Sequence, residues 1–136
     1  MTMFEELREM NNEIRAKVER IAELRASLTS MGSPLSEKVQ TSPTDRLSEI
    51  MCKIVILEKE LDRMIDEYAD LKAMVTGEIF SLENEDWQEI LCSHYVEFLP
   101  WGKIAESRGM TVKAVLRKKD RALKRLRSIR NETKSC

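Results

Sequence analysis

The sequence contains few aromatic residues, glycines and prolines, and these shortages narrow the possible folds. Aromatic side chains make up 5% of the 136 residues, with four glycines and three prolines. A shortage of turn-forming residues beside 35% charged residues favours long helices over a sandwich of short strands. The length suits one ordinary domain or two small ones. We therefore expect an all-α protein.

The three cysteines, Cys52, Cys92 and Cys136, are far apart in sequence and form no CxxC pair. This spacing gives no disulfide framework. Cys52 and Cys92 fall in helical patterns, so we expect both to be small buried apolar groups. We expect Cys136 to be a terminal thiol without a functional role.

Long apolar runs are also missing. No 18 consecutive apolar residues occur, and the first residues include acidic side chains instead of a basic segment followed by an apolar one. We therefore expect neither a membrane span nor a signal peptide, and we expect the protein to be intracellular.

The net charge of −1 hides a strong asymmetry. Residues 101–136 carry twelve Lys and Arg against three Asp and Glu, whereas residues 1–100 carry eleven against twenty-one. The local charges are therefore +9 and −10. Such a distribution indicates a polyanion-binding end attached to a part that stays away from the polyanion.

The first 80 residues carry the pattern of two long helices. Apolar residues recur every seven positions over 3–30, as in a coiled coil, and Gly, Pro and Ser over 31–43 predict a loop. A second helix starts near Thr44 and continues to about Phe80. We expect an antiparallel hairpin over residues 1–80, whose apolar stripes are wider than a two-helix seam needs. We therefore expect the hairpin to pack against another copy or against the C-terminal domain. The first choice is a homo-oligomer, with a dimer as the simplest form, held by Leu47, Ile54, Leu57, Leu61, Met64 and Leu71.

Residues 81–130 carry the pattern of a three-helix domain. Asn84 is a suitable N-cap for a helix from Glu85 to about Val96, and Pro100 suits the first position of the next helix. We expect a polar tail from Ser128 onward, flexible over 131–136. The expected core consists of Trp87, Leu91, Trp101, Ile104, Ala105, Val115, Ala122, Leu123 and Leu126.

Within this domain, residues 100–126 have the pattern of a helix-turn-helix. Gly109 permits the positive-φ turn that ends a helix, and Thr111 can cap the next one. That second helix places apolar residues on one side and basic residues on the other. A short helix, a Gly-containing turn and a cationic helix are what DNA readers of this class require.

This segment resembles the fourth conserved region of bacterial sigma factors, whose helix-turn-helix ends in an Ala-Leu-x-x-Leu signature. Ala122, Leu123 and Leu126 match that signature. Sigma factors read bases with polar residues at the positions of Val112, Lys113 and Leu116. Because two of these three are apolar here, the resemblance implies groove binding more than sigma-type promoter recognition.

Over nearly its whole length, the chain is similar to a family of small helical proteins of phages and prophages in Gram-positive bacteria. These are related to the ArpU-like and RinA-like late-transcription regulators. The matching features are the helical hairpin, the Ser/Pro loop, Leu-Glu and Leu-Lys steps in the long helix, and a W-x-x-I-A segment. They correspond to Leu57, Glu58, Leu71, Lys72, Trp101, Ile104 and Ala105. Two departures are Gly102, where an acidic residue is usual, and Lys118, where an apolar one is common.

The resemblance implies a cytoplasmic, DNA-binding protein of a bacterial host cell that regulates phage or host transcription. RNA polymerase is a further possible partner.

Lys113 and Arg117 are the residues we expect to contact base edges, because Lys and Arg donate hydrogen bonds to guanine O6 and N7. The alternative is a solvated charged face without a ligand. With about four to six phosphates neutralised, the affinity should fall with salt at a logarithmic slope of about −4 to −5. The residues expected to bind phosphates are Thr111, Arg121, Lys124 and Arg125.

Catalysis and metal binding are not expected. His94 is the single histidine, and only Cys92 lies near it, which is too few ligands for zinc. The sequence has no Gly-rich phosphate loop and no G-x-S-x-G motif. We therefore expect no enzyme activity, no cofactor and no metal.

Three functions fit this pattern. The first is a dimeric or oligomeric transcriptional regulator that binds double-stranded DNA. The second is a phage DNA-packaging recognition subunit. Its oligomer would be a ring of many subunits, whereas a regulator usually has two. The third is a protein-interaction module whose basic helix docks on RNA polymerase or another acidic partner, and which would not bind duplex DNA at low salt.

Overall fold

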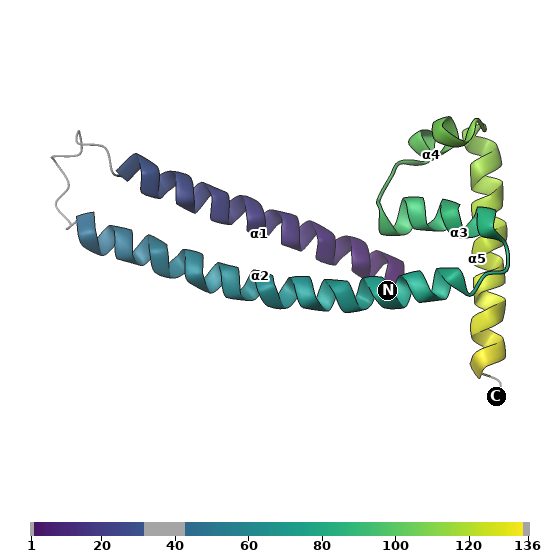
Figure 1. The fold of residues 1–136 in the computed structure, drawn as a ribbon, viewed down its shortest axis with the longest axis horizontal. Helices are drawn as coiled ribbons and strands as arrows, with labels where there is room; N and C mark the ends of the chain where they lie inside the picture. The colour runs from purple at the N-terminus through teal and green to yellow at the C-terminus, as the bar shows by residue number, and fades with distance from the viewer. Residues whose placement is uncertain (1, 32–42, 135–136) are drawn as a thin grey trace. The chain divides into compact units, whose positions relative to one another are not determined.

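The structure is a computed structural model that describes residues 2–31 and 43–134 (Figure 1). The described residues contain helices and no strands, which confirms the expected all-α class. The expected loop over 31–43 lies, apart from its two end residues, outside the described residues, and so does Cys136. The helices are α1 (Met3–Met31), α2 (Pro43–Phe80), α3 (Glu85–Leu91), the π-helix η1 (Cys92–Val96), α4 (Trp101–Arg108) and α5 (Val112–Lys134).

The chain divides into two compact units. Residues 9–68 form one unit, and residues 1–8 together with 69–136 form the other. The last turns of α2 and the first residues of α1 therefore belong to the same unit as α3, α4 and α5.

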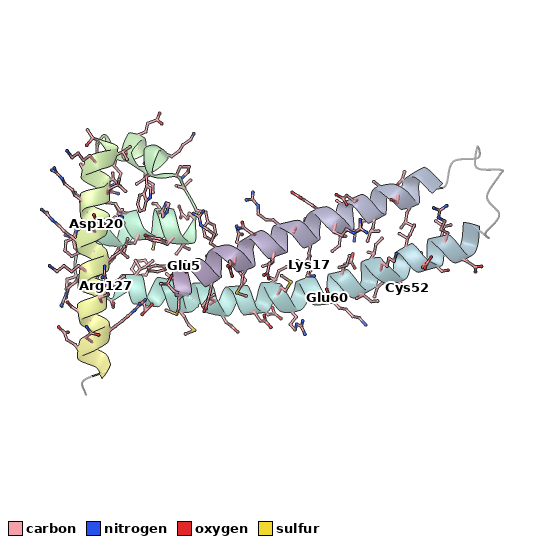
Figure 2. All side chains as sticks on the ribbon, turned by 180° about the vertical axis from the view of Figure 1, so that it is seen from behind. Glu5, Lys17, Cys52, Glu60, Asp120 and Arg127 are labelled. Atoms are coloured by element: carbon pink, nitrogen blue, oxygen red, sulfur yellow. The ribbon has the colours of Figure 1, made fainter. Side chains whose placement is uncertain are left out.

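In the unit of residues 9–68, α1 packs on α2 through a small apolar core. Ile21, Leu24 and Ile54 are each no more than 7% exposed. Lys17 Nζ lies 2.9 Å from Glu60 Oε2 (Figure 2). A second ion pair joins Arg25 to Glu58. The hydrogen bond from Lys17 lowers the pKa of Glu60. The seven-residue repeat thus marks the side of α1 that meets α2.

The expectation that both cysteines are buried is wrong for Cys52. Its side chain is exposed on α2, while Cys92 is half-buried. Cys52 precedes the buried Ile54 by two residues, and two residues correspond to about 200° around a helix. The sequence pattern predicts that a residue lies on a helix. Its burial depends on whether it lies on the side of that helix that packs against another helix.

The unit of residues 1–8 and 69–136 has a core that extends beyond residues 81–130. Leu7, Val75 and Ile79 are fully buried, although they belong to α1 and α2. Of the residues expected in this core, Trp87, Trp101 and Leu123 are half-buried, and the other six are buried. Trp is seldom fully buried because of its size.

The local signals for the ends of helices are confirmed. Asn84 Oδ1 accepts hydrogen bonds from the N–H groups of Asp86 and Trp87, at 2.9 and 3.3 Å. Gly109 has φ +64°, and Thr111 Oγ1 accepts a hydrogen bond from the Ala114 N–H at 3.1 Å. These side chains and this glycine set where α3 and α5 begin and where α4 ends.

Three boundaries differ from expectation. The helix expected over 85–96 changes to π-helical geometry at Cys92, and Pro100 occupies the N-cap of α4 instead of its first position. α5 continues to Lys134, past Ser128, where a polar tail was expected. The ion pair between Arg130 and Glu78, with Nε to Oε1 at 2.7 Å, ties this last part of α5 to α2.

Among residues 2–31 and 43–134, none of the helices has both the length and the hydropathy that a membrane crossing requires.

The two glycines of α4 and its turn should respond oppositely to a methyl group. Gly109→Ala should destabilise the protein by about 1–2 kcal/mol, because an L-residue at positive φ is strained. Gly102→Ala should stabilise it by up to about 1 kcal/mol, because Gly102 is helical and a Cβ there would meet nothing within 4 Å. Urea unfolding of both variants measures the difference. Equal effects of the two changes would contradict the assigned turn.

Candidate nucleic-acid interface

Helices α4 and α5 are held together by a shared apolar core. Ile104 and Ala105 of α4 are buried against Val115 of α5 and Ile90 of α3. The partly buried Trp101 and Met110 pack against this cluster. The turn at Gly109 therefore joins two helices that also pack on α3.

A single carboxylate ties all three helices. Asp86, in the first turn of α3, forms ion pairs with Arg108 at the end of α4 and with Lys118 of α5. Arg108 Nη1 also lies 2.8 Å from Glu89 Oε2. The charge of Lys118 is therefore used for an intramolecular contact.

Among the described side chains of α5, five cations are exposed, and four of them share one side of the helix. Lys113, Arg117, Arg121 and Lys124 are all exposed. At about 100° per residue they lie within an arc of about 80°. Within the described part of the chain, no carboxylate pairs with any of them. Figure 2 shows nitrogen-tipped side chains along the side of α5 that lies away from α3. We call these four residues the cationic face.

Most of the other cations of α5 have an intramolecular contact, namely Lys118, Lys119, Arg125 and Arg130. Arg127 lies outside the cationic face, is exposed and has no ion pair among the described residues. Lys119 Nζ lies 2.9 Å from Asp120 Oδ1 and 5.8 Å from the centre of the Trp101 ring. Arg130 is held by Glu78. Four of the nine Lys and Arg side chains of α5 that the structure describes therefore have a partner within the protein.

Arg125 was expected to bind phosphate, and the structure places it in an ion-pair network. Its Nε lies 3.1 Å from Glu83 Oε1, and its Nη1 lies 3.4 Å from Glu132 Oε1. The hydrogen bond from Arg125 lowers the pKa of Glu83 to about 2. Glu83 precedes Arg125 by 42 residues, so no local sequence pattern indicates this pair.

The structure also shows the exposure of Thr111, Val112 and Leu116 at the start of α5. Thr111 is exposed, and its hydroxyl oxygen accepts the capping hydrogen bond of α5. Val112 is 43% exposed, and Leu116 is half-buried. Only Lys113 among the three sigma-like positions offers a charged group to solvent.

Asp120 was not considered in the sequence analysis. It is exposed, and seven residues after Lys113 it lies on nearly the same side of α5. It therefore places one carboxylate, paired with Lys119, at the edge of the cationic face.

Three of the six residues expected to mediate oligomerisation lie on the side of α2 that packs on α1. Ile54 is 7% exposed and packs with α1, and Leu57 and Leu61 pack against the same cluster. Leu47, Met64 and Leu71 are half-buried. The large apolar side chains of α2 that are exposed are Met51, Val55, Ile56, Ile65, Met74 and Phe80.

His94 belongs to an aromatic cluster. Its ring stacks on Trp101, with 3.7 Å between ring centres, and its Nδ1 lies 2.8 Å from the Leu99 carbonyl oxygen. Because a carbonyl can only accept, Nδ1 is the donor. Burial lowers the pKa of His94, and the charges of Arg8 and Lys119 lower it further, while the hydrogen bond to Leu99 opposes this shift.

No group of three or more His, Cys, Asp or Glu side chains in the described ranges is arranged to hold a metal ion.

Comparison with known proteins yields no relative. No family model, no curated protein and no solved structure matches this chain. An assignment of function therefore depends on the exposed charges of α5 and on the sequence itself.

The Glu83–Arg125 pair should contribute to the acid stability of the protein. Because the pKa of Glu83 is lowered from 4.5 to about 2, its contribution is present above pH 4.5 and is lost as the pH falls towards 2. Glu83→Gln should flatten the stability profile between these two values. The measurement is the urea midpoint as a function of pH.

Glu106→Gln is the control, since Glu106 is exposed on α4 and has no ion pair among the described residues. If both substitutions changed the pH dependence of stability equally, the loss of stability at low pH could not be assigned to Glu83.

Proposed function

We propose that this chain is a sequence-specific DNA-binding transcriptional regulator of phage or prophage type. In this proposal α4 and α5 form a helix-turn-helix, α1 and α2 form an antiparallel hairpin, and α5 enters the major groove. The observation that carries the proposal is the cationic face, whose four side chains are exposed and unpaired within the described residues.

The dimensions of α5 suit such a role. A helix with its side chains is about 10–12 Å across, and the major groove of B-DNA is about 12 Å wide. Lys113 and Arg117 lie one turn apart near the start of α5, the part of a recognition helix that reaches base edges. Arg121 and Lys124 follow on the same side, where they would meet phosphates and position the helix.

The paired cations narrow the proposed interface. Arg125 is engaged by Glu83, so the proposal assigns phosphate binding to Arg121 and Lys124, with Thr111 beside them at the start of the helix. Asp120 on the same side opposes phosphate contact. Its charge lowers affinity for any duplex, and this favours sites where the base contacts compensate.

The proposal includes binding without catalysis, in the cytoplasm of a bacterial host, and action as a dimer or higher oligomer. One small helix-turn-helix offers few contacts, and paired copies bind two half-sites. For self-association we propose the exposed side of α2 that carries Met51, Val55 and Ile65, which are 57%, 48% and 45% exposed. At about 100° per residue these three lie within about 80° of one another.

The first test is binding of duplex DNA. Random duplexes should bind at low salt. Arg121 and Lys124 from both copies of a dimer neutralise four phosphates, which at about 0.9 each give a logarithmic salt slope of about −3.6. Among duplexes selected from a random pool, the double change Lys113→Ala and Arg117→Ala should flatten the selected sequence, because base contacts are lost. Lys124→Ala should weaken all duplexes alike.

Lys59→Ala is the matched control, because Lys59 is exposed on α2, outside the proposed interface. Equal losses for the control and the double variant would show that only general charge matters. An absence of binding at low salt would favour docking on an acidic protein such as RNA polymerase, and a large ring of subunits would favour a packaging role.

The second test is the oligomeric state. Ile65→Lys should shift the protein from dimer to monomer at micromolar concentration, because it places a charge in the proposed apolar contact. Ile56→Lys is the control, since Ile56 is 57% exposed but lies about 140° around α2 from Met51. Light scattering after size-exclusion chromatography measures both. A monomeric parent protein, or equal effects of the two lysines, would disprove this contact.

A further inference from the structure

A cavity lies beside α5, away from the cationic face. Its volume is about 360 Å³, which falls within the usual range for small-molecule sites of about 300–1,000 Å³. It is formed by the first residues of α1, by η1 and by the second half of α5. All of these belong to the unit of residues 1–8 and 69–136.

The inner wall of the cavity is apolar and aromatic. Phe4 and Tyr95 stack with 4.4 Å between ring centres and 17° between ring planes, and Leu123 and Leu126 of α5 complete the wall. Burial raises the pKa of Tyr95, so its hydroxyl stays neutral at physiological pH. An alkyl chain would lose water on this surface, which favours binding.

The rim of the cavity carries an excess of positive charge. Arg8, Arg127 and Arg130 line it, against Glu5 as the one acidic lining residue (Figure 2 labels Glu5 and Arg127). Arg130 is neutralised by Glu78, with Nη2 to Oε2 at 2.8 Å.

The remaining two arginines are not neutralised. Arg8 lies 5.5 Å from the centre of the Phe98 ring, and Arg127 is exposed, with no ion pair among the described residues. These two arginines have no acidic partner among the described residues and lie beside an apolar wall. A ligand that joins an anionic group to an apolar group would match both features.

We propose that this cavity binds an amphipathic carboxylate, a short acyl chain with an anionic head. The chain lies on Phe4, Tyr95 and Leu123, and the carboxylate accepts hydrogen bonds from Arg127, with the charge of Arg8 nearby. Planar guanidinium groups bind carboxylates well because they donate two parallel hydrogen bonds. This site uses neither Lys113 nor Arg117, so it stands whether or not the protein binds DNA.

Calorimetric titration of the full chain with octanoate tests the proposal. Octanoate should bind, while octylammonium, with the same chain and the opposite charge, and inorganic phosphate, with the charge and no chain, should bind at least about tenfold more weakly. Arg127→Gln should weaken octanoate about tenfold or more, as expected for loss of a charge-assisted hydrogen bond. Leu123→Trp should also weaken it by filling the cavity.

Arg15→Gln is the control, because Arg15 is exposed on α1 outside the cavity. Circular dichroism checks that each variant is folded. If the Leu123→Trp variant does not fold, the Arg127→Gln variant alone decides the test. Four results would each overturn the proposal: no binding of octanoate, equal binding of octylammonium, equal binding of phosphate, or the same loss for Arg15→Gln as for Arg127→Gln.

Discussion

The arrangement of α3, α4 and α5 depends on one carboxylate, that of Asp86. It pairs with Arg108 at the end of α4 and with Lys118 of α5, and all three side chains are partly shielded from solvent. Shielded pairs depend more strongly on geometry than exposed ones, because water screens them less. The apolar contacts of Ile104 and Val115 bring the helices together, and the two ion pairs fix how they are turned.

The same contacts separate the cations of α5 into two groups. Lys118 and Arg125 pair with carboxylates of neighbouring segments, whereas Lys113, Arg117 and Lys124 extend into solvent. The charge of the last quarter of the sequence is therefore not all available to a partner. The proposed interface is smaller than composition alone indicates, but it is also more sharply defined, because it occupies one side of one helix.

Features set by neighbouring residues were predictable. The cap at Asn84, the positive φ of Gly109 and the cap at Thr111 each involve groups a few residues apart, and the structure confirms all three. Arg125 and Cys52 show where prediction stopped. The partner of Arg125 is 42 residues away, and the exposure of Cys52 depends on which side of α2 meets α1.

The sequence by itself determined the helical class, the ends of most helices and the gathering of positive charge near the carboxyl end, because periodicity, capping and composition act over short distances. Tertiary structure alone decided which cations remain unpaired. It also formed the cavity that both Phe4 and Leu123 line. Both outcomes need residues far apart in the chain to meet. Such meetings depend on how whole helices pack, and the order of residues within one helix does not specify that packing.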